Sequence, residues 1–171
     1  MSRKVNERNL RTLRDLLKLH ENRYCFDCGS TLPSYANLFT YTFICEKCSG
    51  FHRELSHRVK SISASIFTPA EISALVSGGN AKATRIWLAK WTAKDYPLPA
   101  HGDLDLVKEF IRQKYVRRRW VDEGLLASQS QAPKVSHVLI STSDNLSSPC
   151  ESAFPLSILA SYLNYISTNT F

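Results

Sequence analysis

The residues best suited to chemistry in this sequence are four cysteines in two close pairs. Each pair has the form C-x2-C and sixteen residues separate the pairs, which are Cys25 with Cys28 and Cys45 with Cys48. This spacing is typical of a structural zinc site, in which four thiolates surround one ion. Because protein ligands fill all four positions, we expect one structural zinc ion that is not itself a Lewis acid. Four free thiols or an iron–sulfur centre are the alternatives.

A second chemical feature follows the last cysteine pair directly. His52 and Arg53 stand four and five residues after Cys48. A guanidinium is planar and permanently charged, so it can bridge the oxygens of a phosphoryl group or contact the phosphates of a nucleic acid. His52 is interpreted as a packed side chain, because the expected zinc ion already has four ligands.

The charge of the chain favours an anionic partner and is unevenly distributed. The 171 residues include 22 Lys and Arg against 15 Asp and Glu, for a net charge of +7. Residues 121–171 contain one Lys and four acidic residues, so the first 120 residues carry +10. Nucleic acid, acidic lipid headgroups and an acidic protein surface are all compatible with this charge. Neither a signal peptide nor a membrane span is indicated, and we expect an intracellular protein.

Hydrophobic periodicity predicts the elements that position these residues. Apolar residues at helical spacing predict helices over 6–20, 48–55, 69–77, from about 80 onward, and over 104–119. Strands are predicted over 38–44 and 59–67. Thr68, Pro69 and Glu71 form the expected capping box of the third helix. We place a domain at 1–122 and a Ser-rich, disordered tail at 123–171.

The cysteine spacing together with Arg53 resembles a known family. The Arf GAPs, GTPase-activating proteins for ADP-ribosylation factors, share the signature C-x2-C-x16-C-x2-C-x4-R. "CSGFHREL" at 48–55, "VKSIS" at 59–63, "GGN" at 78–80 and "EFIRQKYVRRRW" at 109–120 follow in the family's order. The resemblance covers residues 8–120 and is strongest to the branch of the nucleoporin-like and some plant Arf GAPs.

This resemblance implies a fold, an activity and partners. The expected fold is α+β, with a small antiparallel sheet at the zinc finger and about five helices around it. The expected activity is stimulation of GTP hydrolysis on the GTP form of an Arf-family GTPase, with Arg53 as the catalytic arginine finger. The implied protein is a cytoplasmic monomer in vesicle trafficking, at the periphery of Golgi or other membranes or at the nuclear envelope. An acidic membrane surface is a further expected partner.

The sequence also differs from the family's usual pattern around the expected finger. Tyr35 replaces a Trp, and Phe39 and Tyr41 replace an Asn and a Gly. Ser56 replaces a Gly, Ser65 replaces an Asp, and about three residues are missing between 55 and 59.

Two other functions remain open at this point. A catalytically weak adaptor would bind Arf without accelerating hydrolysis. A nucleic-acid module like the GATA fingers, with C-x2-C-x17-C-x2-C spacing, would use the basic charge, and Arg58 and Lys60 would then contact phosphate. Nucleic acid is the less favoured partner, because the amphipathic helices that continue to residue 119 need a common core.

Overall fold

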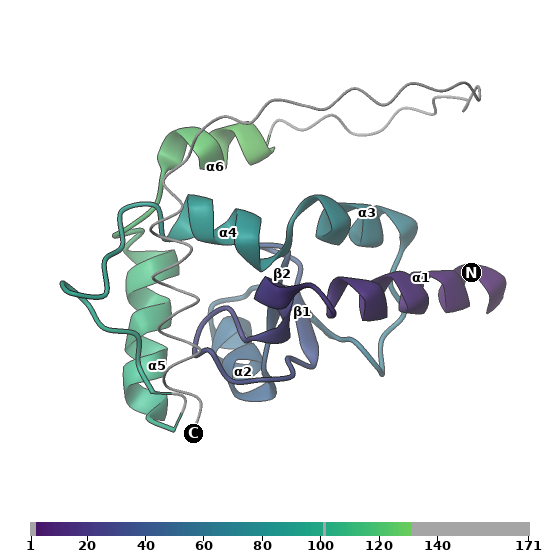
Figure 1. The fold of residues 1–171 in the computed structure, drawn as a ribbon, viewed down its shortest axis with the longest axis horizontal. Coiled ribbons are helices and arrows are strands. Elements are labelled where there is room, and N and C mark those ends of the chain that lie inside the picture. The colour runs from purple at the N-terminus through teal and green to yellow at the C-terminus, as the bar shows by residue number, and fades with distance from the viewer. Residues whose placement is uncertain (1–2, 101, 131–171) are drawn as a thin grey trace.

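A computed structural model of the chain describes residues 3–100 and 102–130. The elements are, in order, α1 (Arg3–Leu16), η1 (His20–Arg23), β1 (Tyr35–Asn37), β2 (Thr42–Ile44), α2 (Glu46–Glu54), β3 (Val59–Ser61), α3 (Pro69–Ser77), α4 (Gly79–Trp87), α5 (Leu104–Ile111), η2 (Arg112–Val116) and α6 (Glu123–Ser130). Figure 1 shows the short strands near the centre, with α1 and α3 on one side and α5 on the other. The expected α+β fold with a small sheet among helices is confirmed.

The sheet has three antiparallel strands in the order β2-β1-β3. Tyr35 in the central strand pairs with Ile44 of β2 and with Ser61 of β3. The prediction of one strand over 38–44 is wrong in its first half, because residues 38–41 turn the chain from β1 back into β2. β2 leads directly into Cys45, as predicted. The strand predicted over 59–67 is also too long, since the chain turns after Ser61.

Polar side chains and one left-handed residue make the turn between β1 and β2. The Phe39 N–H donates to Asn37 Oδ1 at 2.9 Å, and the hydroxyls of Thr40 and Thr42 lie 2.8 Å apart. Tyr41 has φ of 56°, a conformation that no strand residue adopts. Such side-chain bonds to the local backbone favour turns over extended chain. They therefore override the β propensity of the run that begins at Leu38.

The "GGN" segment joins α3 to α4 and fastens both to the rest of the domain. A Cβ on Gly78 would lie 2.7 Å from Cβ of Tyr41, and Gly79 has φ of 86°. Glycine is needed at the first position for the close approach and at the second for its backbone conformation. Asn80 then accepts from the Phe43 N–H at 2.8 Å and donates to the Tyr24 carbonyl at 2.8 Å. A loop motif of the sequence thus joins α4 to β2 and to the first cysteine pair.

The remaining helices occur where the sequence predicts them, but some begin or end at other residues. The capping box before α3 is confirmed, with Thr68 and Glu71 each bonding the other's backbone N–H. α1 begins and ends earlier than the predicted helix, at Arg3 and Leu16. The last predicted helix is α-helical only to Ile111 and continues as the π-helical turn η2. Among residues 3–100 and 102–130, no helix has the length and apolar character needed to cross a bilayer.

α6 lies beyond the boundary predicted at residue 122. It occupies Glu123–Ser130, and Leu125 and Leu126 pack partly buried against the main core. The first part of the predicted tail is therefore a helix that contacts the domain. Residues 131–171, the rest of the predicted disordered tail, lie outside the described residues.

Two clusters of buried apolar side chains stabilise the fold on opposite sides of the sheet. The larger cluster surrounds the cysteines and contains Trp87, Trp91, Phe110 and other residues of α4 and α5. The smaller one joins α1 and α3 to the sheet and includes Leu13, Ala36, Phe43, Phe67 and Leu75. Burial of such side chains contributes about 1.5–3 kcal/mol each. The cysteines thus lie within the larger core, and α1 covers the smaller one.

Candidate metal centre and the neighbouring arginine

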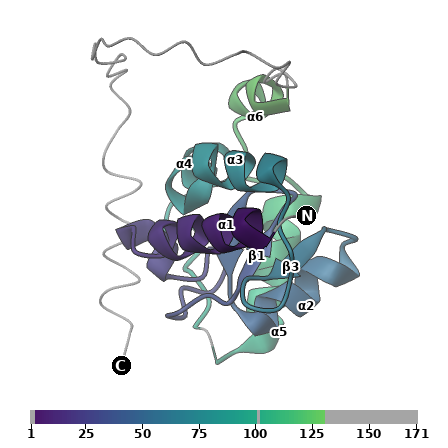
Figure 2. The same ribbon diagram turned by 90° about the vertical axis from the view of Figure 1, so that its right-hand side faces the viewer.

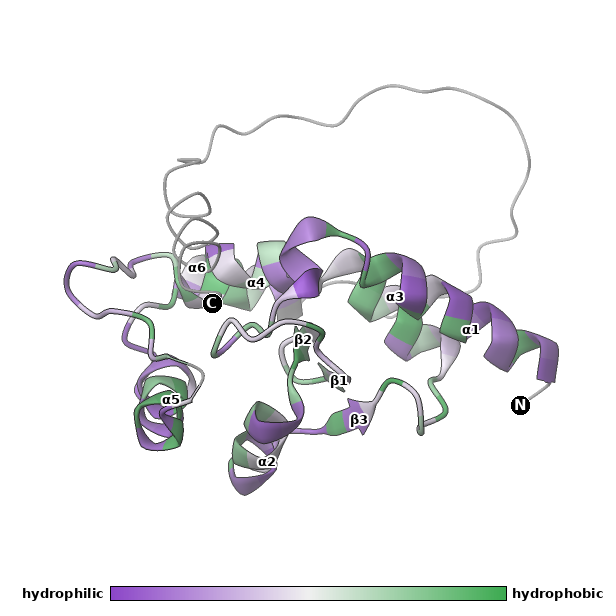
Figure 3. Cartoon of the chain, turned by 60° about the horizontal axis from the view of Figure 1, so that its bottom comes forward, coloured by the Kyte–Doolittle hydropathy of each residue, from purple (hydrophilic) through white to green (hydrophobic). Residues whose placement is uncertain are grey.

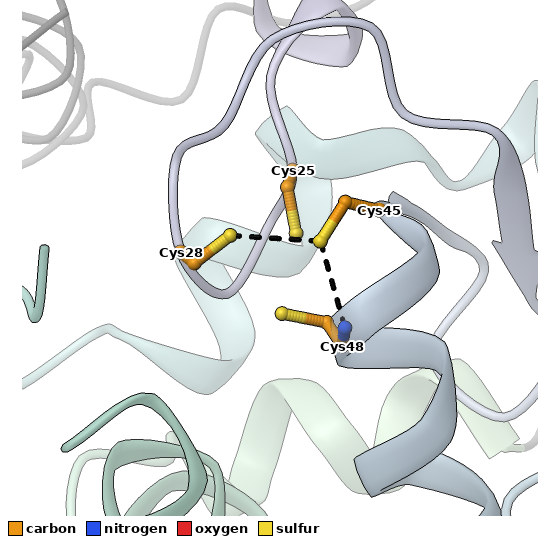
Figure 4. A group of neighbouring side chains, drawn as sticks. All are labelled: Cys25, Cys28, Cys45 and Cys48. Carbon is orange, nitrogen blue, oxygen red and sulfur yellow. Dashed lines mark hydrogen bonds between the residues drawn. The ribbon is translucent and has the colours of Figure 1, made fainter. Parts of the chain in front are cut away.

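The four cysteines predicted to bind zinc converge at one point (Figure 4). Their Sγ atoms all lie within 4.8 Å of one another, and those of Cys28 and Cys45 are 3.7 Å apart. A tetrahedral site with Zn–S bonds of about 2.3 Å has sulfur–sulfur edges of about 3.8 Å. The cysteines are unbridged, with Cys25 and Cys48 buried. The donor set therefore fits one zinc ion.

Local backbone geometry shapes each cysteine pair for this purpose. In the first pair, the Gly29 N–H donates to the Cys25 carbonyl at 2.9 Å, and Gly29 has φ of 69°. In the second pair, Cys45 is the N-cap of α2, and its Sγ accepts from the Cys48 N–H at 3.5 Å. Both turns aim two sulfurs toward one centre. The short spacing within each pair is sufficient to form them.

The thiols do not share one ionisation behaviour. Burial raises the pKa of Cys25, and hydrogen bonds with the neighbouring thiols raise the pKa of Cys48. Hydrogen bonds from the neighbouring thiols lower the pKa of Cys28 and Cys45. The protein alone therefore does not stabilise four thiolates together. A divalent cation at the centre would supply the missing positive charge.

A buried charged cluster that no sequence pattern predicts adjoins the first cysteine pair. Asp27 Oδ1 lies 2.7 Å from Lys114 Nζ and accepts from the Tyr115 hydroxyl at 3.0 Å. Asp27 Oδ2 lies 2.8 Å from His52 Nε2. The side chains of Asp27, His52 and Lys114 are all fully buried. Burial alone would raise the pKa of Asp27, but the charge of Lys114 and the hydrogen bonds from His52 and Lys114 outweigh it and hold that pKa well below its usual range.

His52 links this cluster to the sheet and to the end of α2. With Nε2–H donating to Asp27, Nδ1 accepts from the Asn37 amide at 3.1 Å. The Nδ1 atom of His57 also lies 2.8 Å from His52 Nδ1. Burial and then the neighbouring His52 lower the pKa of His57 to about 4. The interpretation of His52 as a packed residue is consistent with these contacts, and His57 stacks on Phe39 with ring centroids 4.1 Å apart.

Arg53, the next residue of α2, faces a different side of the helix and is exposed. Its guanidinium carbon stands 5.3 Å from the centroid of the Tyr35 ring, and in the described part of the chain it forms no ion pair. The helix ends just after it, where the Ser56 N–H donates to the Arg53 carbonyl and the His57 N–H to the His52 carbonyl, both at 2.9 Å. Ser56 has φ of 60°, the left-handed conformation that usually selects glycine. The backbone of Arg53 is thus fixed while its charge stays free.

The basic residues that follow are engaged within the fold. Arg58 Nη2 lies 2.6 Å from Glu71 Oε1, and Lys60 Nζ lies 2.8 Å from Glu71 Oε2. The side chain of Lys60 is only 19% exposed. Burial would raise the pKa of Glu71, but the hydrogen bonds from Lys60 and the Thr68 N–H lower it overall. Lys60 therefore stabilises the start of α3 and is poorly placed as a phosphate contact, whereas Arg58 pairs with Glu71 but has a side chain that is 67% exposed.

Comparison with known proteins agrees with this geometry. Residues 10–124 match the model of the ArfGap family, whose description is a GTPase-activating protein for Arf. The chain belongs to the ArfGAP family. The Arabidopsis thaliana protein named "Probable ADP-ribosylation factor GTPase-activating protein AGD14" is 42% identical over 119 residues, 70% of this chain and 18% of AGD14. Human Arf-GAP domain and FG repeat-containing protein 1 is 42% identical over 120 residues, 69% of this chain and 21% of that protein.

Solved ArfGAP structures share the fold as well as the sequence. The ArfGap domain of HIV-1 Rev binding protein superposes with a TM-score of 0.66 at 41% identity, covering 72% of this chain and 96% of that domain. The chain therefore contains an ArfGAP zinc finger with its four-cysteine cluster. It spans about a fifth of the length of the curated relatives AGD14 and the FG repeat protein.

Proposed function

We propose that this ArfGAP domain accelerates GTP hydrolysis on an Arf-family GTPase and that Arg53 is its arginine finger. One observation carries the proposal: a cation that forms no ion pair within the described residues projects from a helix that begins at the cysteine cluster. Arginine is suited to this role because its planar charge can bridge the γ-phosphate oxygens and the leaving-group oxygen as negative charge develops there. The GTPase would hold the GTP, its magnesium ion and the attacking water.

The rigidity of α2 supports this assignment. One zinc ion would be held by Cys25, Cys28, Cys45 and Cys48. When bound, it fixes the turns of the two cysteine pairs and supplies no reaction step. The His52 side chain anchors the buried side of α2 by hydrogen bonds to Asp27 and Asn37. The Arg53 guanidinium packs against the Tyr35 ring. A finger supplied to another protein must arrive in one place, so each of these contacts favours catalysis.

The partners and location follow from the same proposal. The docking partner would be the GTP form of an Arf protein, met at the periphery of a cytoplasmic membrane, and this chain would act as a monomer. The catalytically weak adaptor is the second candidate function, favoured by Ser56 and by the shortened loop that follows Arg53. The nucleic-acid alternative loses support at Lys60, which is mostly buried and paired with Glu71.

Single-turnover GTP hydrolysis by a myristoylated Arf on liposomes tests the proposal, with the zinc-loaded chain and its Arg53→Lys variant. An arginine finger contributes about 10³ to 10⁵ in rate, so the lysine variant should lose nearly all stimulation while it still binds the GTPase. Arg85→Lys, at an exposed position of the largely buried α4, is the matched control and should retain the rate of the unmodified chain.

Three outcomes would contradict the proposal in different ways. Unchanged turnover in Arg53→Lys would reject the finger. Binding of Arf without stimulation by the unmodified chain would identify an adaptor. Absence of both, together with duplex DNA binding that weakens steeply with salt, would support the nucleic-acid module.

A further inference from the structure

The outward face of α1 is strongly basic and serves no purpose within the fold. Its inner face covers the smaller core with Leu13, and Asn9 Nδ2 donates to the Phe67 carbonyl at 2.8 Å. Six basic and two acidic residues occupy the helix and its first following turn on the exposed side; these are Arg3, Lys4, Arg8, Arg11, Arg14 and Lys18, with Glu7 and Asp15. Figure 2 shows α1 lying across the near side of the molecule, and Figure 3 shows how polar it is.

Ion pairs within the described fold neutralise only two of these six basic side chains. Glu7 pairs with Arg3 at 3.0 Å, and Asp15 pairs with Lys18 at 2.7 Å. Within the described residues Lys4, Arg8, Arg11 and Arg14 form no ion pair, although the hydrogen bond from Lys18 and then the charge of Arg11 help to lower the pKa of Asp15. The three arginines at the end of η2 contrast with them: Arg117 and Arg118 lie near Glu109 and Glu123, and Arg119 covers the Tyr96 ring. We name the outward side chains of Lys4, Arg8, Arg11 and Arg14 the α1 basic face.

Two exposed leucines lie in the segments that follow this helix. Leu19, three residues beyond the end of α1, is 52% exposed, and Leu32 is 84% exposed. The backbone of Leu32 is tied to the end of η1, since its N–H donates to the Arg23 carbonyl at 3.0 Å. Leu32 also has φ of 56°, which costs about 1–2 kcal/mol for a residue with a Cβ. Folding alone gives no reason for an apolar side chain in such a position.

We propose that the α1 basic face, with Leu19 and Leu32, is a docking surface for an anionic lipid bilayer. Cations near such a surface attract acidic headgroups, and neighbouring apolar side chains enter the interface between headgroups and acyl chains. Exposed leucines favour a bilayer over nucleic acid, which would be bound by the cations alone. This inference does not depend on Arg53, so either proposal can fail without the other.

Flotation of the full zinc-loaded chain with phosphatidylcholine vesicles, with and without phosphatidylserine, tests this surface. Binding should require phosphatidylserine and weaken with salt. Each Lys or Arg near an anionic bilayer contributes about 1 kcal/mol, or about fivefold in affinity. The triple variant Arg8→Glu, Arg11→Glu, Arg14→Glu should therefore bind at least about 100-fold more weakly. The triple variant Arg85→Glu, Lys90→Glu, Lys94→Glu changes the net charge equally and should retain most of the binding.

Leu32→Asn separates a membrane role from a structural one. Asparagine accepts the left-handed conformation, so the variant should be at least as stable as the unmodified chain in urea unfolding. Its vesicle affinity should nevertheless fall about tenfold, because the inserted side chain is lost. Val116→Asn is the matched control, since Val116 is 61% exposed in η2, which continues α5 on the other side of the sheet from α1, and it should not contribute.

The proposal would be overturned by vesicle binding that is absent at low salt or equally weakened by both triple variants. It would also be overturned if single-stranded RNA bound in a salt-dependent way, with loss in the α1 variant, while vesicles did not bind. Unchanged vesicle affinity in Leu32→Asn would remove the leucine from the surface and leave a purely electrostatic contact that contradicts the apolar part of the proposal.

Discussion

Lys114 and Arg53 are two cations in contrasting environments: Lys114 is fully buried, and Arg53 is exposed on α2. Lys114 is fully buried, lies 2.7 Å from Asp27, and stands 4.0 Å from the centroid of the Phe26 ring. Arg53 is exposed, forms no ion pair with the described residues, and lies over the Tyr35 ring. Removing a charge from water is costly unless a partner compensates it. The charge of Lys114 is thus neutralised inside the fold, whereas the charge of Arg53 is accessible to a partner molecule.

His52 and Arg53 show the same contrast between adjacent residues. The His52 side chain joins Asp27, Asn37 and His57 in the interior, while the next side chain points to solvent. A helix turns about 100° per residue, so neighbours necessarily face different environments. The His-Arg pair therefore combines an anchor and a free cation within one helical turn.

Metal removal should have the largest effect on stability. By unfolding the domain it should also abolish the difference in burial between Lys114 and Arg53. Closing a four-thiolate zinc site contributes about 10–16 kcal/mol, so chelation should unfold the domain. Circular dichroism with a zinc-release assay measures this. A metal-free chain that stays folded would contradict the zinc assignment.

Substitution by methionine should show most clearly that Lys114 stabilises the fold and Arg53 does not. Lys114→Met leaves the Asp27 carboxylate buried without its main counter-charge, and breaking such a pair costs about 3–5 kcal/mol. Arg53→Met should change the free energy of unfolding by no more than about 0.5 kcal/mol, because that side chain is exposed. Urea unfolding at neutral pH compares them, and equal losses would refute the division of roles.

The smallest effect is expected at the end of α2. Ser56→Gly should stabilise the domain by up to about 1 kcal/mol, because glycine adopts the left-handed conformation without a Cβ clash. Ser65→Gly is the control; Ser65 has no positive φ, so glycine there should lower stability by about 0.5–1 kcal/mol. Thermal unfolding of both variants with zinc bound measures the difference. A gain at Ser65 equal to that at Ser56 would argue against strain at the helix end.

Much of the fold and the cysteine cluster could be predicted from the sequence, because the relevant signals are local. The capping box at Thr68 and the helical spacing after it involve residues within one or two turns. The two C-x2-C pairs form turns of a few residues each. The first half of the strand predicted over 38–44 is wrong because Tyr41 adopts a left-handed conformation that its residue type does not indicate, while Thr42–Ile44 form β2.

The buried cluster was missed for a different reason. Lys114 stands four residues after Phe110 and seven after Val107, on the apolar stripe of the last helix, and this position was the available signal. Its partner Asp27 lies 87 positions earlier in the chain, so no local pattern connects the two. Likewise, the sequence around Arg58 and Lys60 indicates an unpaired basic edge, and only the structure places Glu71 beside both side chains.

The sequence by itself determined the metal-binding pattern, the helical stripes and the family, because each depends on spacing along the chain. Only the tertiary structure decided which cations are used within the fold and which stay free. The reason is that the fate of a charge depends on its burial and on the nearest opposite charge. Both are set by packing between segments far apart in sequence, such as the first cysteine pair and the turn that follows α5.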